Sequence, residues 1–237
     1  KVTVKKTFGL MKRIIFYHPH FLPDNPVKGS ELHPVSMKNA FESIGYQVDM
    51  VIGGSKERKK SIKKIKSNIK TGIKYEFLFA ESSNLPVPIS DSHHIPLRPF
   101  LDYRFFKFLN KNSVPVGLFY MDIYWRFKEF NYQKSIKHLI KLLFHWVEWK
   151  GIIKTVDHLF LPTESLGEFL PNKWSKQNLS ALYPGFDAAT SKTHNLKKSN
   201  EGLHLLYVGG VKPPYYDIAP ILEVVNQLNN NITLVLC

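Results

Sequence analysis

Cysteine is almost absent from this sequence of 237 residues, and long apolar runs are missing altogether. The one cysteine, Cys237, cannot form a disulfide within the chain, and a zinc site built from several cysteines is excluded. This cysteine usage is typical of a reducing compartment, so we expect a cytoplasmic protein. No apolar run approaches the roughly 20 residues that a membrane-spanning helix needs, and no signal peptide is recognisable after the basic N-terminus.

Acidic residues are also few, since 19 Asp and Glu stand against 33 Lys and Arg and leave a formal net charge of +14. Basic residues are dense between Lys56 and Lys74, where Glu57 is the one acid. Such an excess indicates a polyanionic partner: nucleic acid, an anionic membrane surface or phosphate-bearing substrates. Charge alone does not choose among these. The hydrophobic content of 43% predicts a globular chain.

Short apolar runs alternate with helical patterns along most of the chain. The predicted strands are Arg13–Tyr17, Val48–Ile52, Tyr75–Ala80, Val114–Tyr120, His158–Leu161 and Ser180–Leu182. The predicted helices are Pro34–Ile44, a basic helix after Ile52, Leu101–Leu109 and Gln133–Thr155. Strands separated by helices favour right-handed crossovers, so we predict an α/β fold with a Rossmann-like, mainly parallel sheet.

The first predicted helix has clear start and stop signals. Pro34 suits its first turn and Gly45 ends it. The face expected to pack on the sheet holds Met37, Ala40, Phe41 and Ile44.

The composition changes after the sixth predicted strand. We expect a first domain over residues 11–187, a polar linker over 188–202 and the start of a second domain over 203–237. The second part begins a new unit with strand Leu203–Val208, helix Ile218–Leu228 and strand Ile232–Leu236. A unit that stops at its second strand cannot bury both faces alone, so we expect the second domain to be truncated.

Five segments resemble glycosyltransferase family 4 enzymes of the GT-B fold when they are taken in order. They are Lys28–Ser30 with the later Gly45–Val48, Tyr120–Trp125, Val156–Thr163, Tyr183–Asp187 and Leu206–Gly210. Each is weak alone, but their order and spacing cover nearly the whole chain. The sequence departs from the family pattern at Met121, where many members have a histidine, and at Gly210, where an arginine often contacts the donor diphosphate.

The resemblance implies transfer of a sugar from a nucleotide-sugar donor, usually with retention and without an essential metal or other cofactor. Its two Rossmann-like domains would share the work, with the acceptor on the first and the donor on the second. The donor-binding candidates are Gly29, Ser30, Gly209, Gly210 and Lys212. Glycines allow close backbone approach to phosphate, and helix N-termini favour anions, although these glycines can equally serve tight turns.

Ligands of open α/β sheets bind at the carboxyl ends of the strands. That rule selects Asp122 as the catalytic candidate, which would orient the acceptor or a neighbouring base. The alternative for Asp122 is a helix cap or a partner for Arg126. The acceptor-binding candidates are Glu81, Ser82, Tyr124, Thr163 and Glu164. For the last two the alternative is a capping box, Ser165 with Glu168, that opens a helix.

Four histidines lie in predicted loops. His94 is a candidate acceptor-side base, and His18 and His20 can face the cleft equally well. His93 and His94 do not match a zinc-ligand spacing, so no metal site is expected.

Two basic amphipathic segments suggest a membrane surface. Ile62, Ile65, Ile69 and Ile73 share one helix face beside a stripe with Lys59, Lys63 and Lys66. The segment 137–150 adds Trp146 and Trp149, which suit a membrane interface. The alternative for both is a core-facing helix with a solvated basic side.

The sequence therefore predicts a glycosyltransferase acting on a cell-envelope polysaccharide or a lipid-linked acceptor, peripheral at the inner face of the membrane. One alternative is an inactive truncated remnant that acts as a binding module. A basic nucleic-acid-binding α/β protein is a weaker alternative, because the sequence holds no RNA-binding motif and places its aromatic residues in strands and amphipathic helices.

Overall fold

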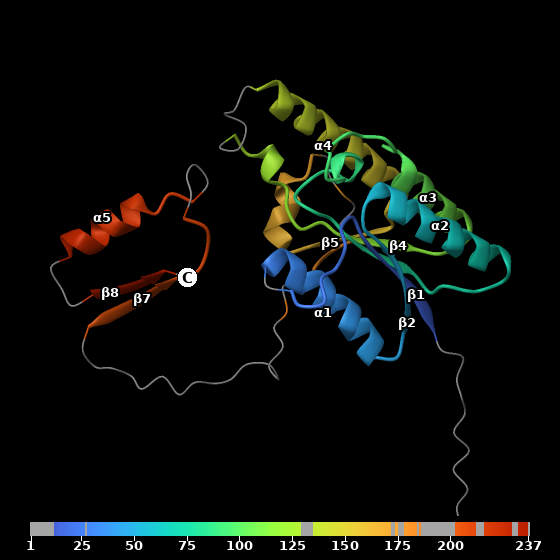
Figure 1. The fold of residues 1–237 in the computed structure, drawn as a ribbon, viewed down its shortest axis with the longest axis horizontal. Coiled ribbons are helices and arrows are strands. Elements are labelled where there is room, and N and C mark those ends of the chain that lie inside the picture. The colour runs from blue at the N-terminus through green and yellow to red at the C-terminus, as the bar shows by residue number, and fades with distance from the viewer. Residues whose placement is uncertain are drawn as a thin grey trace, which may run out of the picture. The chain divides into compact units, whose positions relative to one another are not determined.

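The chain divides into two compact units, Lys1–Phe186 and Asp187–Cys237. The computed structural model describes residues 12–26, 28–128, 135–171, 174, 178–183, 185, 202–211, 216–228 and 232–236 (Figure 1). The predicted linker 188–202 lies outside the described residues except for Gly202. Each unit is described by itself.

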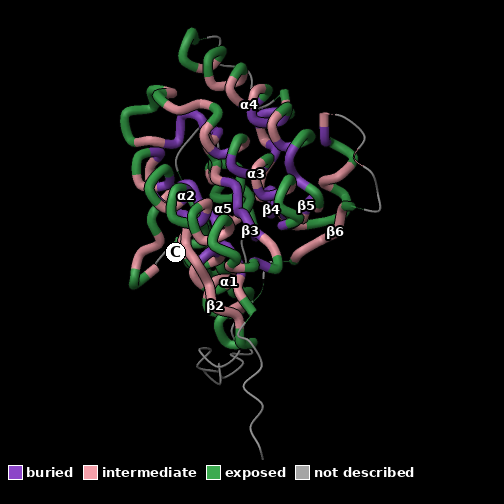
Figure 2. The backbone as a smooth tube through the Cα atoms, turned by 90° about the vertical axis from the view of Figure 1, so that its right-hand side faces the viewer, coloured by how far each residue is buried: buried purple, intermediate pink, exposed green. Residues whose placement is uncertain are grey.

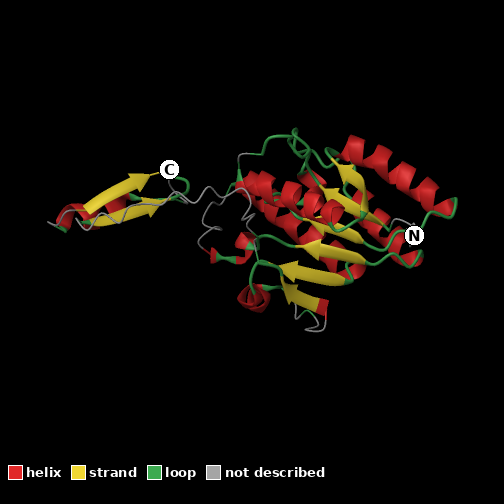
Figure 3. Cartoon of the chain, turned by 90° about the horizontal axis from the view of Figure 1, so that it is seen from below, coloured by secondary structure: helices red, strands yellow, loops and turns green. Residues whose placement is uncertain are grey.

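The first unit is built on a six-stranded sheet in which every strand pair is parallel (Figure 3). Its strands are β1 (Arg13–His18), β2 (Gln47–Ile52), β3 (Leu78–Glu81), β4 (Val116–Phe119), β5 (His158–Leu161) and β6 (Leu179–Ala181). Their order is β2-β1-β3-β4-β5-β6. The predicted α/β class with a Rossmann-like parallel sheet is confirmed.

Helices cover both faces of this sheet. They are α1 (Gly29–Ser43), α2 (Ser55–Lys70), α3 (Leu101–Lys111) and α4 (Ile136–Thr155). The chain moves from β1 to β2 in one direction and then returns past β1 to β3, so right-handed crossovers place α1 opposite the other three helices. Figure 1 shows α1 on one side of the sheet and the layer of α2, α3 and α4 on the other.

Two clusters of buried side chains fill the space between the helices and the sheet. The larger one lies under α2, α3 and α4 and includes Ile65, Phe105, Trp149 and Leu159. The smaller one, Phe16, Phe79 and Phe119, packs against α1 through Met37 and Phe41. Figure 2 shows burial along the central strands and α3, whereas the first turns of α4 are exposed.

Helix α1 differs from its prediction in where it starts and in which residues pack on the sheet. It begins at Gly29, so Pro34 lies inside the helix rather than in its first turn. The missing N–H of Pro34 costs one bond, while Glu31 accepts a hydrogen bond from the backbone N–H of Lys28 at 3.4 Å and closes the first turn. Ala40 is exposed and Ile44 is 70% exposed, so these two were wrongly assigned to the packed face.

Two shorter elements also depart from expectation. Strand β3 begins at Leu78 and not at Tyr75 as predicted. Tyr75 lies before the strand, where its hydroxyl donates a hydrogen bond to Asp49 at 2.6 Å and accepts one from Asn68 at 2.9 Å. The predicted Ser165–Glu168 capping box does not form. Instead a 3₁₀ helix, η4 (Glu164–Phe169), starts after Thr163.

The second unit is a βαβ element, as its sequence pattern predicts. It consists of β7 (Leu203–Tyr207), α5 (Ala219–Gln227) and β8 (Ile232–Leu236). The two strands are parallel, with Leu203 paired to Ile232. In the part of the chain that the structure describes, no helix has both the length and the apolarity to cross a bilayer.

Candidate functional site

The strand order places a topological switch point between β1 and β3, because the connections that leave these adjacent strands run in opposite directions. Open α/β sheets bind ligands in the crevice at such a point, outside the carboxyl ends of the strands. Here β1 ends at His18 and β3 ends at Glu81. The residues that follow these ends therefore define the candidate site.

A hollow of about 560 Å³ opens beside this point. The loop after β1 lines it with His20 and Phe21, and the first turn of α2 lines it with Gly54 and Ser55. The segment between β3 and α3 completes it with Asp91, His93 and Arg98. The lining comes from three separate connections at the carboxyl edge and combines polar side chains with apolar ones such as Phe21 and Leu97.

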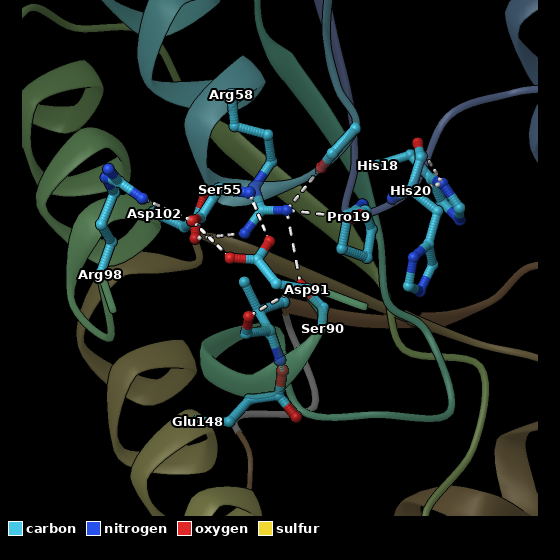
Figure 4. A network of polar contacts seen from close by, with 12 residues as sticks. His18, Pro19, His20, Ser55, Arg58, Ser90, Asp91, Arg98, Asp102 and Glu148 are labelled. Atoms are coloured by element: carbon cyan, nitrogen blue, oxygen red, sulfur yellow. Dashed lines mark hydrogen bonds and ion pairs between the residues drawn. The ribbon is translucent and has the colours of Figure 1, made fainter. Parts of the chain in front are cut away.

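One buried guanidinium ties these connections together (Figure 4). Arg58 of α2 forms a bidentate ion pair with Asp102 of α3, with distances of 3.0 and 3.1 Å. Its Nη1 donates to the carbonyl oxygens of Pro19 at 3.0 Å and Gly53 at 2.6 Å. Because both groups of the pair are buried and hydrogen-bonded, the network fixes the floor of the hollow.

The carboxylate of Asp91 occupies the N-terminus of α2. Ser55 donates to it twice, from its backbone N–H and from its hydroxyl, each at 2.6 Å, and Arg98 donates to the Ser55 hydroxyl at 3.1 Å. Burial alone would raise the pKa of Asp91, but the hydrogen bonds from Ser55 and the charge of Arg58 lower it. The positive end of the α2 dipole is therefore already satisfied by a carboxylate from this chain.

The histidines after β1 are neutral at pH 7. His18 is buried, and burial lowers its pKa to about 4. Its Nδ1 lies 3.1 Å from the carbonyl oxygen of His20 and 3.3 Å from the backbone nitrogen of His20. Burial also lowers the pKa of His20, which lines the hollow.

A second polar group sits at the end of β3. Glu81 is fully buried, and its Oε2 lies 3.0 Å from Nδ1 of His33 on α1. The imidazole of His33 stacks on Phe119, with ring centroids 4.6 Å apart. Burial raises the pKa of Glu81, although His33 opposes the shift.

Sequence reasoning selected Glu81 and missed His33. Because the first helix was predicted to begin at Pro34, His33 lay outside any element and had no assigned direction. A helix that starts at Gly29 carries His33 onto the sheet face near the end of β3. Lys28 is not a residue type that signals an N-cap, so the sequence held no local signal for that start.

Asp122 and Tyr124 follow the end of β4. Asp122 accepts a hydrogen bond from the backbone N–H of Tyr124 at 2.8 Å, but the N-cap of the following 3₁₀ helix, η2 (Tyr124–Arg126), is Ile123. Partial burial raises its pKa despite that bond and the charge of Lys141. The hydroxyl of Tyr124 donates to the carbonyl oxygen of Asn84 at 2.7 Å, which links the loops after β3 and β4.

Beneath this loop lies a buried pair on α4, His145 and Glu148. Burial lowers the pKa of His145 to about 3 and raises the pKa of Glu148 to about 8. Glu148 accepts a hydrogen bond from the backbone N–H of Val87 at 3.0 Å. Both groups are neutral at pH 7, so the 3.8 Å between His145 Nδ1 and Glu148 Oε2 is not an ion pair.

The structure brings some predicted residues together and leaves others apart. Glu81 and Ser82 lie next to the β4 loop, where the Ser82 hydroxyl accepts from the backbone N–H of Met121 at 2.9 Å. Thr163 and Glu164 are exposed, and the Thr163 hydroxyl bonds to Ser165. His94 is exposed, with its Nδ1 3.1 Å from the carbonyl oxygen of Ile89, whereas its neighbour His93 lines the hollow.

The donor-binding candidates divide between the two units. Gly29 and Ser30 open α1 and are exposed, and a Cβ at Gly29 would meet nothing within 4 Å. In the second unit, a Cβ at Gly210 would lie 2.7 Å from the ring of Tyr216, so packing requires a glycine there. Gly209 is exposed after β7. Lys212 lies outside the described residues.

The membrane candidates are placed unequally. Trp149 is 1% exposed and belongs to the core, which contradicts its prediction as an interface residue. The reason is helical phase, since Trp149 shares the inward side of α4 with Ile152. Trp146 is 40% exposed. Lys59 and Lys63 are exposed, and Nζ of Lys66 lies 5.0 Å from the ring centroid of Phe108.

Together, the first unit is a Rossmann-like α/β domain with a hollow at the carboxyl edge of its sheet. No cluster of three metal-binding side chains occurs among the described residues. No family model and no curated protein matches the chain. Among solved structures, the chain is similar to the apo form of the lipopolysaccharide outer core galactosyltransferase WaaB, at a TM-score of 0.49 and 12% sequence identity. The similarity covers 94% of this chain, which spans 60% of the length of that protein.

Proposed function

We propose that this chain is the acceptor-side part of a nucleotide-sugar-dependent glycosyltransferase of the GT-B type. The observation that carries the proposal is where the five family-like segments fall. Gly29 opens α1, Asp122 follows β4, Thr163 follows β5, Tyr183 follows β6 and Gly209 follows β7. Each therefore sits where a strand ends or a helix begins, the positions at which Rossmann-like domains bind their ligands.

The proposed acceptor site is the carboxyl edge of the first unit. Sugar hydroxyls need paired donors and acceptors, and Asp122 and Tyr124 offer them after β4. Glu81 and Ser82 are buried at the neighbouring end of β3, where they contact His33 and the backbone of Met121. Asp122 is the residue we assign to orienting the acceptor hydroxyl, since a carboxylate has acceptor capacity beyond its backbone hydrogen bonds from Ile123 and Tyr124.

We propose donor-binding residues in each unit taken by itself. The backbone N–H groups at the N-terminus of α1 favour the diphosphate, because they carry the positive end of the helix dipole. Among the described residues, no carboxylate from another segment caps that end in the way that Asp91 caps α2. In the second unit, the glycines after β7 allow close approach of the backbone to a phosphate. In this proposal the nucleotide sugar is a co-substrate, no metal takes part, and the anomeric configuration is retained.

We propose a cell-envelope polysaccharide or a lipid-linked sugar as the acceptor. The excess of cations supports an acceptor held at an anionic membrane surface. Nucleic-acid binding has only the charge in its favour. The sheet aromatics Phe16, Phe79 and Phe119 are buried beneath α1 and cannot stack on bases.

The test is release of nucleoside diphosphate by the full-length protein from UDP-glucose, UDP-galactose, UDP-N-acetylglucosamine and GDP-mannose, with and without octyl glycosides or an envelope lipid extract. We expect acceptor-stimulated release from at least one donor. Asp122→Ala should lower that rate by roughly 100-fold with an unchanged unfolding midpoint. Glu42→Ala, on the exposed end of α1 at the opposite edge of the sheet, is the control.

The two possible failures are distinct. Absence of release from every donor by the unmodified protein would refute the transferase proposal as a whole. An unchanged rate in Asp122→Ala would remove that residue from the site and leave the activity standing.

A further inference from the structure

The first half of α4 presents apolar side chains away from the core. Ile136, Leu139, Ile140 and Leu143 are 71%, 55%, 47% and 60% exposed. Their spacing of three, one and three residues places them on one stripe of the helix. Figures 1 and 2 show these first turns of α4 projecting beyond the rest of the helix layer.

The core-facing side of α4 is a different stripe. His145, Glu148, Trp149 and Ile152 are buried. At 100° per residue they lie on the side of the helix opposite Leu139 and Leu143. The exposed leucines and isoleucines are therefore not the edge of the core. Four large apolar side chains in one exposed stripe are unusual for a monomer and mark an interaction surface.

Cations continue the same outward stripe. Lys150 and Lys154 follow Leu143 on this side of α4, and both line a groove of about 440 Å³ against α3. Arg104 and Lys107 line the other wall of that groove. Among the described residues, none of these four cations forms an ion pair.

Helix α2 adds a second cationic groove to the same helix layer. Its volume is about 750 Å³, and none of the described residues that line it is acidic. The lysines that line it are Lys56, Lys59, Lys60, Lys63, Lys66 and Lys70. In the described part of the chain, these lysines have no carboxylate within ion-pair distance.

Two of the three acids of this layer are buried. Helices α2, α3 and α4 contain Glu57, Asp102 and Glu148. Asp102 is buried against Arg58, and Glu148 is buried beneath Val87. Glu57 lines the polar hollow at the N-terminal end of α2. The outer surface of the layer therefore combines uncompensated positive charge with one exposed apolar stripe.

We propose that the outer surface of the α2–α3–α4 layer docks on an anionic lipid bilayer. Ile136, Leu139, Ile140 and Leu143 enter the acyl region, and the cations of the two grooves lie on the headgroups. This combination of a basic surface with an apolar helix stripe is the chemistry of interfacial binding. Trp146, which is partly exposed at the end of the stripe, sits at the depth that indole rings prefer.

Two other occupants fit the surface less well. A nucleic acid would use the cations but leave the leucines and isoleucines in water. A second copy of the chain would cover the apolar stripe but bring two cationic layers toward each other. The docking surface does not depend on the transferase proposal, because it is defined without any catalytic residue.

The experiment is co-sedimentation of the full chain with vesicles of phosphatidylcholine alone or with about 30% phosphatidylglycerol added to supply a negative surface potential. We expect binding to the anionic vesicles that weakens with salt. Leu139→Ser/Leu143→Ser should lower the partition coefficient by at least about tenfold. Ile44→Ser, which changes an equally exposed side chain at the end of α1, should leave it unchanged.

A second set of variants, in which lysines are replaced by glutamate, measures the electrostatic contribution to vesicle binding apart from the apolar one. Lys59→Glu/Lys63→Glu/Lys66→Glu should lower binding by roughly 100-fold, since each cation near an anionic surface contributes about fivefold. The matched control reverses Lys12, Lys28 and Lys38, away from the helix layer. Brominated lipid in the vesicles should quench the fluorescence of Trp146. The quenched part of the emission should be missing in Trp146→Phe.

Three results would overturn the inference. They are absence of binding to anionic vesicles, equal binding by Leu139→Ser/Leu143→Ser, and equal losses in the two charge-reversal variants. A dimer in sedimentation velocity that Leu139→Ser/Leu143→Ser disperses, without vesicle binding by the unmodified chain, would assign the stripe to a second copy. Unchanged unfolding midpoints in all variants exclude misfolding as the cause.

Discussion

Replacing Glu148 by glutamine should change the stability of this protein in a pH-dependent way. The carboxyl group is fully buried on α4, and burial raises its pKa from 4.5 to about 8. A glutamine side chain has almost the same shape and keeps a carbonyl oxygen for the backbone N–H of Val87, so Glu148→Gln removes the titration with little change in packing.

The sign follows from proton linkage. Between the unfolded pKa and the folded one, the unfolded chain has lost this proton while the folded chain still holds it. The contribution of Glu148 to the free energy of unfolding is therefore fully present below pH 4.5 and declines as the pH rises toward 8. The decline is a little over 1 kcal/mol per pH unit, or about 5 kcal/mol in total as an upper bound.

Urea unfolding of the unmodified protein and Glu148→Gln at pH 5, 7 and 9 measures this effect. We expect the variant to gain relative stability steadily with pH and to be the more stable protein at pH 9. His145 contributes equally to both proteins and cancels in the difference. Glu76→Gln, at an exposed carboxylate, is the control. A stability difference that does not vary with pH would refute the assignment of a protonated carboxyl group at Glu148.

Three further changes test buried contacts within the first unit. Arg58→Met should lower the free energy of unfolding by about 3–5 kcal/mol by leaving Asp102 buried without its partner, and Asp102→Leu in the same chain should restore much of the loss in chemical denaturation. Asp91→Ala should cost about 1–2 kcal/mol by uncapping α2, with the loss shrinking as the pH falls because the pKa of Asp91 is lowered in the folded state. Gly151→Ala should cost about 1–3 kcal/mol in thermal unfolding, since its Cβ would lie 2.5 Å from the ring of Tyr103; no loss would mean that this ring moves freely.

The sheet was predictable from sequence because its strands are short apolar runs with little competition. His158–Leu161 was predicted to the residue, and its neighbours were displaced by a few residues at most. Parallel strands that are buried on both faces of a sheet appear in the sequence as short continuous apolar runs. The strands of this sheet show that pattern. The α/β class followed from the same pattern.

Side-chain direction was harder to predict, since it depends on helix phase and on which neighbour occupies each face. Trp149 and Trp146 are three residues apart on one helix, yet one is in the core and the other is partly exposed. Ile136 and Leu139 look like core residues in sequence and are exposed. A period of 3.6 identifies a stripe, but it does not say which stripe meets the sheet when a helix is apolar on two sides.

Residues of the candidate site that directly follow a strand were predicted from the sequence. Residues that join the site through a hydrogen bond or ion pair with a distant segment were missed. Glu81 and Asp122 were selected by the carboxyl-end rule. His33 and the Arg58–Asp102 pair depend on contacts across 48 and 44 residues, for which the sequence offers no local signal. Arg58 lies in the basic helix but is 1% exposed, unlike the lysines Lys59 and Lys63 on the same helix.

The Arg58 network has a consequence for local motion. Its guanidinium holds the loop after β1, the end of β2 and the start of α3 at once. Opening any one of these segments breaks bonds that anchor the others, so they should open as a single cooperative unit rather than loop by loop. Amide hydrogen exchange at Ser55, Ser90 and Asp102 should then approach the rate of global unfolding. The hollow should therefore change its conformation little when a ligand binds. Selectivity among ligands would then depend on how well their shape matches the hollow, and not on loops that close over them.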